Sequence, residues 1–321
     1  MGKLRCSNNI EDEMQDWVAL DFYSVSAGLN TVIGVTSDGR ILLKKMNEDK
    51  RPLCDMKPMF LTVPSQSDLL WQGSPGSIRY LQVAVSKLSG HYAWVQIDQG
   101  GQLHLKTSDI FRKVLPNSMS TSGSSEFVDE CPGIALSDAL FVLEKNGHVS
   151  LFDNDPIRTD GNYRDISRWS DVVRLVTGLQ NSVFGITSKG NVLCTGWNCI
   201  KGPHGDIRDM MRSLTNVTDI CTTGSECETI LVTKDDGTVL NPGTGEVLYN
   251  NAYIPRGVNR GQILDSHFNH HAYVLTDEKK LISLFGDGID PQVNQWQNVS
   301  SFAIGNRGYL DPFILAICEQ G

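Results

Sequence analysis

The sequence predicts an all-β fold built from repeated units, and three observations support that prediction. Short runs rich in Val and Ile recur along the chain, turns containing Gly separate them, and Trp returns at one position of the unit. The clearest unit is residues 169–198, WSDVVRLVTGLQNSVFGITSKGNVLCTGWN. Its apolar runs at 172–176, 181–188 and 191–195 predict three strands joined by turns. Gly190 is expected to supply the positive φ of a tight hairpin turn.

Six further stretches are imperfect copies of this unit. They are residues 17–43, 78–105, 126–152, 214–240, 261–285 and 296–321. Their turn residues are spaced by 41–47 residues, except for one interval of 62 residues between Gly39 and Gly101. A period of roughly 40–50 residues with several short strands per unit is typical of β-propellers. We therefore expect a single domain, residues 1–321, with seven blades.

The last unit, 296–321, stops at its turn and lacks a third strand. Residues 2–9, GKLRCSNN, resemble the third strand of the clearest unit, GNVLCTGWN at 190–198. We expect residues 1–9 to complete the last blade and close the ring. Closure hides sheet edges that would otherwise be exposed.

The pattern W-x-D-V-V-x-x-x-x-G-x-x-x-S-V-x-x-x-T-x-x-G-x-V-x-x-x-G-x-N in residues 169–198 resembles the repeat of the regulator of chromosome condensation family. That resemblance implies a seven-bladed propeller with protein partners. Members of the family include an exchange factor for a small GTPase, a β-lactamase inhibitor and modules of ubiquitin ligases. The family's closing motif G-x-N-x-x-G-Q-L-G survives here only as residues 196–198 followed by Lys201-Gly202. No position matches the catalytic loop of the exchange factor.

A second family is the alternative. The tectonin repeat of lectin-like propellers also carries a Trp in each unit, and it would make the protein a carbohydrate-binding lectin with exposed Trp and Asp on each blade. Its shorter unit fits the observed spacing less well.

Composition and charge narrow the possible functions. The chain of 321 residues has a net charge of −9, which argues against a nucleic-acid binder. No apolar run approaches the roughly 20 residues of a membrane span, and the first residues have no apolar core like that of a signal peptide. The eight cysteines lack the spacing of a disulfide scaffold. We expect a monomer in the cytoplasm or nucleus.

Motifs of catalysis and metal binding are missing. The sequence has no P-loop, no G-x-S-x-G elbow and no H-E-x-x-H pair. Cys194, on an apolar run, and Cys199 are interpreted as small buried hydrophobes rather than zinc ligands. We expect no enzyme, no catalytic residue, no cofactor and no metal. The favoured function is a protein-interaction scaffold that regulates a small GTPase or another enzyme.

Partner binding is expected in loops and at aromatic residues outside the repeat pattern. Residues 46–77 form a long insertion between blades, and long loops often carry binding sites. Lys44, Lys45, Lys50 and Arg51, which follow the third strand of the first blade, are predicted to lie in a solvated loop. Trp17, Trp169 and Trp296 share one repeat position and are expected to pack in the core, whereas two other tryptophans do not share it. The candidate partner-binding residues are Trp71, Trp94, Trp197, His204 and His270.

Overall fold

The computed structural model describes most of the chain. The described residues are 2–46, 67–72, 78–86, 91–98, 103–107, 133–136, 139–144, 146–152, 163, 165–178, 182–196, 199, 205–223, 229–254, 263–266, 271–285, 288–307 and 311–319. No helix among them is long and apolar enough to cross a membrane.

Antiparallel strands dominate the described residues, so the prediction of an all-β class is confirmed. In chain order the strands are β1 (Gly2–Cys6), β2 (Asp21–Gly28), β3 (Thr31–Thr36), β4 (Arg40–Lys45), β5 (Ser67–Gln72), β6 (Ile78–Val85), β7 (Tyr92–Asp98), β8 (Leu103–Thr107), β9 (Ile134–Leu136), β10 (Leu140–Leu143), β11 (Val149–Phe152), β12 (Val172–Thr177), β13 (Ser182–Thr187), β14 (Val192–Gly196), β15 (Val217–Thr223), β16 (Thr229–Lys234), β17 (Val239–Leu240), β18 (Val247–Tyr249), β19 (Leu264–Ser266), β20 (Ala272–Leu275), β21 (Leu281–Ser283), β22 (Val299–Arg307) and β23 (Asp311–Glu319).

Short helices lie between some of these strands. They are η1 (Asn8–Ile10), α1 (Glu11–Val18), η4 (Ile166–Arg168), α4 (Arg208–Arg212) and η5 (Pro291–Gln295).

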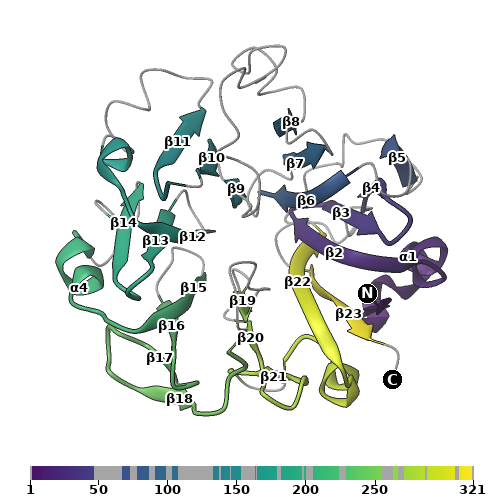
Figure 1. Ribbon diagram of the computed structural model, residues 1–321. Helices are drawn as coiled ribbons and strands as arrows, with labels where there is room; N and C mark the ends of the chain where they lie inside the picture. The colour runs from purple at the N-terminus through teal and green to yellow at the C-terminus, as the bar shows by residue number, and fades with distance from the viewer. Residues whose placement is uncertain are drawn as a thin grey trace, which may run out of the picture.

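The strands pair with their neighbours in sequence to form successive antiparallel sets. The sets are β2–β5, β6–β8, β9–β11, β12–β14, β15–β18 and β19–β21, followed by β22, β23 and β1. Figure 1 shows these sets arranged around a centre, with the first strand of each set innermost. The first strands contact one another in order, β2 with β6, β6 with β9, and so on to β22, which contacts β2.

The two ends of the described chain share one sheet, as the sequence predicts. β1 pairs antiparallel with β23, with Gly2 opposite Glu319 and Cys6 opposite Leu315. β1 also pairs briefly with β2, so that β22, β23 and β1 join β2–β5 in one seven-stranded sheet. Leu4 of β1 is fully buried in the apolar cluster beneath this sheet.

The helix α1 differs from the sequence prediction, which begins a strand-rich unit at residue 17. Glu11, Asp12 and Glu13 occupy its first turn, where carboxylates interact favourably with the helix dipole. Met14 and Trp17, three residues apart on one face, are fully buried. Helical spacing over only eight residues is a weak signal in a sequence dominated by strands.

The hairpin turn of one strand set accepts a backbone hydrogen bond from the first strand of the next set, and this contact recurs along the chain. Gly190 has a φ of 73°, as predicted, and its carbonyl accepts a hydrogen bond from Val217 N of the next set at 2.9 Å. A Cβ at Gly190 would lie 2.7 Å from Asn216 Cα, so the close approach also requires glycine. In the turn after β20, where the glycine is missing, Lys279 adopts a φ of 60° and its carbonyl accepts from Val299 N at 2.9 Å.

The apolar core lies between neighbouring sets. Trp17 and Trp169 are buried and Trp296 is partly buried, so their expected packing role is confirmed. Cys194 and Cys199 are buried in the cluster between β13, β14, α4 and the β15–β16 pair. This burial agrees with their interpretation as small hydrophobes. Among the described residues, no group of three or more His, Cys, Asp or Glu side chains could hold a metal ion.

The prediction of a solvated loop is wrong for Lys44 and Lys45, whereas Lys50 and Arg51 lie outside the described residues. Lys44 and Lys45 belong to β4, because the β3–β4 ladder continues until Thr31 lies opposite Lys45. Successive side chains of a strand point to opposite faces. Lys44 lies on the same face as Leu42, which packs against α1, and it is buried in an ion pair with Asp16, whereas Lys45 lies on the other face and is exposed.

Candidate functional site

The structure describes two of the five candidate partner-binding residues and brings those two together. Trp71 lies in β5 and Trp94 in β7, and both belong to one apolar cluster. Trp197, His204 and His270 lie outside the described residues. The candidate site therefore lies at the junction of the β2–β5 and β6–β8 sets.

Strand alternation explains why these side chains meet. Ile33 and Val35 of β3 lie two residues apart, and so do Tyr92 and Trp94 of β7, so each pair faces one side of its sheet. The two faces pack against each other, with Trp71 partly buried at their margin. In the order of hydrogen-bonded strands, β5 is the last of its sheet.

Trp94 is not the exposed anchor that the sequence suggested. Its side chain is only 8% exposed, because β7 turns this residue toward β3 and β4. Its ring stacks on that of Tyr92, with centroids 6.3 Å apart and planes at 14°. Its indole N–H is buried and has no hydrogen-bond partner in the part of the chain that the structure describes. Trp94 thus supports the partly buried Tyr92 from the side of the core.

A cation lies over this aromatic pair. Lys45 Nζ is 5.6 Å from the centroid of the Tyr92 ring and donates a hydrogen bond to Thr31 Oγ1 at 3.0 Å. Loss of surrounding water lowers the pKa of Lys45, while the charge of Asp68 acts in the opposite direction. The pKa of His91 is also lowered, first by burial and then by the charge of Lys45. Both shifts come first from loss of surrounding water, which disfavours the positively charged forms of the two side chains.

We call this set the β4–β7 surface. It consists of Lys45, Trp71, His91 and Tyr92, with the buried Trp94 beneath them. Lys45, His91 and Tyr92 are not among the site residues predicted from the sequence. The alternation of Tyr92 and Trp94 in HYAWVQID was the signal that could have paired them. Chemically, the surface offers two aromatic faces and one fixed ammonium, groups that are enriched where proteins bind one another.

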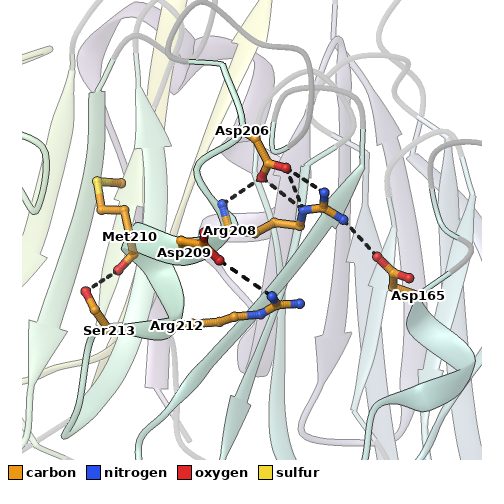
Figure 2. Close-up of polar contacts among 7 residues, drawn as sticks. All are labelled: Asp165, Asp206, Arg208, Asp209, Met210, Arg212 and Ser213. Carbon is orange, nitrogen blue, oxygen red and sulfur yellow. Dashed lines mark hydrogen bonds and ion pairs between the residues drawn. The ribbon is translucent and has the colours of Figure 1, made fainter.

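A second polar cluster, around α4, is already paired internally (Figure 2). Arg208 donates through Nε to Asp206 Oδ1 at 2.9 Å and through Nη1 to Asp165 Oδ2 at 3.0 Å. The Arg208 hydrogen bonds lower the pKa of Asp206 to about 2. Arg212 faces Asp209 at 3.7 Å. Because Arg208 joins α4 to the residue preceding η4, we interpret this cluster as a link between two loops rather than as an open binding site.

Comparison with known proteins identifies the fold but not a close relative. No protein-family model matches the chain, and no curated protein matches its sequence. Among solved structures, Prp20p from Saccharomyces cerevisiae superposes with a TM-score of 0.57 at 10% identity, covering 100% of this chain and 92% of that one. The chain has an RCC1-like β-propeller fold.

Two further structures agree with that assignment. Yeast RCC1 (Prp20) in complex with Kap60 gives a TM-score of 0.52 at 11% identity, covering 96% of this chain and 82% of that chain. Human WBSCR16 also gives 0.52 at 11% identity, with coverage of 94% and 88%. The RCC1-like fold explains the repeated strand sets. At such identities the likeness concerns the fold alone.

Proposed function

We propose that this RCC1-like protein is a non-enzymatic protein-interaction scaffold. In this proposal residues 1–321 form one domain, a seven-bladed ring that β1 closes by pairing with β23. The protein acts as a monomer in the cytoplasm or nucleus. It presents the β4–β7 surface to a protein partner, and it uses no cofactor, metal or catalytic residue.

The observation that carries the proposal is the β4–β7 surface itself. Trp71 and Tyr92 are only partly buried, although each has a large apolar ring. Aromatic side chains backed by a packed core lose little conformational freedom on binding, which is why they dominate the energetics of many interfaces. Lys45 adds a charged group beside them.

The structural neighbours support protein partners in general. Prp20p is described by its binding to Gsp1p and histones, and yeast RCC1 has been solved bound to Kap60. We propose a small GTPase, or another enzyme, as the target that this scaffold regulates. The burial of Trp17 and Trp169 favours the scaffold over a lectin, because those repeated tryptophans do not offer stacking surfaces to sugars.

The test compares partner recovery by tagged variants of the full chain. Partners of the wild type are recovered after cross-linking and identified by mass, and then compared with those of a Trp71→Ala/Tyr92→Ala variant. The matched control is Val247→Ala, which removes an apolar side chain that is 51% exposed on β18. The expected result is a partner lost from the double variant and kept by the control, with both variants melting cooperatively. An unchanged partner set in a folded double variant would place the docking surface elsewhere.

A direct assay tests the GTPase proposal. Purified Gsp1p carrying a fluorescent GDP is mixed with the wild-type chain. Regulation of such a GTPase predicts a change in nucleotide release that depends on the concentration of this protein. Unchanged release together with no binding would remove the GTPase proposal and leave the scaffold proposal standing.

A further inference from the structure

The Lys45 ammonium is held by a hydroxyl group and lies over an aromatic ring. It donates to Thr31 Oγ1 at 3.0 Å and lies 5.6 Å from the Tyr92 ring centroid. Within the described residues it forms no ion pair, whereas the preceding Lys44 is paired with Asp16. The side chain of Lys45 is exposed at the end of β4. A positioned, accessible ammonium of this kind is a ready donor to an anion.

Two neighbouring side chains, Asp68 and His91, interact electrostatically with Lys45. Its own pKa is lowered chiefly by loss of water, and its charge contributes to the lowered pKa of the neighbouring His91. Asp68 is the carboxylate whose charge opposes the shift of Lys45. An anion placed beside Lys45 would stabilise the charged forms of both Lys45 and His91.

We propose that the β4–β7 surface binds an aspartate or glutamate side chain from an extended segment of the protein partner. Lys45 donates to the carboxylate, and the Tyr92 ring packs against the aliphatic part of the same segment. This inference rests on the proposed scaffold function and specifies the chemistry that its surface recognises.

A carboxylate fits the donor set better than a phosphate. Among the described side chains of this surface, the nitrogen groups that can carry positive charge are one ammonium and one imidazole, with no guanidinium. Phosphate recognition commonly uses the bidentate fork of arginine or a larger number of positive charges. The net charge of −9 also repels a polyanion such as nucleic acid at long range.

The test uses defined peptides and the isotope-labelled full chain. An N-acetylated, C-amidated hexaglutamate peptide is titrated while the indole N–H resonance of Trp94 and the imidazole resonances of His91 are followed by NMR. We expect saturable shifts of both, and no saturable shift with the matching hexaglutamine peptide. Lys45→Gln should weaken hexaglutamate binding about tenfold or more. Lys189→Gln, which removes an exposed lysine from the turn before β14, should leave the affinity within about twofold.

Three results would overturn the inference. They are the absence of saturable shifts at Trp94 and His91, equal affinity of wild type and Lys45→Gln, and Lys45-dependent binding of inorganic phosphate as tight as that of the peptide. The outcome is separable from that of the scaffold proposal. If Trp71→Ala/Tyr92→Ala loses the cellular partner while Lys45→Gln keeps it, the proposed docking surface stands and the proposed recognition of a carboxylate by Lys45 is wrong.

Discussion

Arg174 of β12 and Asp219 of β15 join two neighbouring sheets through a two-point ion pair. Nε donates to Oδ1 at 3.1 Å and Nη2 to Oδ2 at 2.9 Å. Asp219 Oδ2 also accepts from the backbone N–H groups of Ile263 at 2.8 Å and Leu264 at 3.1 Å, where β19 begins. One fully buried carboxylate therefore connects three successive inner strands.

Replacing that carboxylate should destabilise the fold strongly. Asp219→Ala leaves the Arg174 guanidinium without its partner and the two N–H groups without their acceptor, so we expect a loss of about 3–5 kcal/mol in the free energy of unfolding. Urea denaturation measures it. Asp209→Ala is the matched control, because Asp209 is fully exposed opposite Arg212, and it should hardly move the midpoint. Equal midpoints for the two variants would contradict the role given to Asp219.

Removal of residues 2–9 should cost far more stability than trimming an ordinary terminus. The deletion exposes the edge of β23 and removes Leu4 from the core. Leu4→Ala alone should cost about 2–5 kcal/mol. Lys3→Gln is the control, since its salt bridge with Asp21 at 3.1 Å is exposed on both sides. Thermal unfolding checks all three variants, and a deletion that melts like the full chain would show that β1 is dispensable.

Substitutions at two glycines can distinguish the cost of backbone strain from the cost of a steric clash. Gly190 and Gly245 have similar φ angles, 73° and 74°. A Cβ at Gly190 would meet the Asn216 backbone at 2.7 Å, whereas one at Gly245 meets nothing within 4 Å. Gly245→Ala should therefore lower the free energy of unfolding only by the cost of holding alanine in the left-handed region, about 1–2 kcal/mol. Gly190→Ala should lower it by more. Chemical denaturation of both variants tests this order, and equal losses would refute the clash.

The pKa of His91 should respond to Lys45. Lys45→Gln removes one of the two causes that lower this pKa, so the pKa should rise toward its ordinary value of 6.5 while burial still holds it lower. His91 has a lowered folded-state pKa, so its contribution to stability is present above pH 6.5 and is lost as the pH falls through the folded value. The wild type should therefore lose more stability than Lys45→Gln on acidification below pH 6.5. NMR titration and denaturation at several pH values measure both effects, and an unchanged His91 pKa would exclude the coupling.

Features set by short-range pattern could be predicted from the sequence. The three strands of the unit at 172–196 agree with prediction to within a residue or two. The positive φ at Gly190 follows from its turn, and the pairing of β1 with β23 follows from the likeness of two short segments.

Features set by distant neighbours could not be predicted in this way. The burial of Lys44 depends on Asp16, which is 28 residues away in sequence. The burial of Trp94 depends on the facing strands β3 and β4. Lys45 and His91 belong to no sequence motif, and only the fold brings them together at the junction of two strand sets.

The pairing of β1 with β23 also has a consequence during biosynthesis. Each residue of β1 pairs with one that follows it by more than 300 positions. At about 5–20 residues added per second, the ribosome makes the second strand some 15–60 s after the first. During that interval the nascent β1 lacks this partner and is available to other unpaired edges. β1 thus receives its longest ladder of hydrogen bonds only after the strands between it and β23 have been made, and chaperone protection in the meantime would matter most for these few residues.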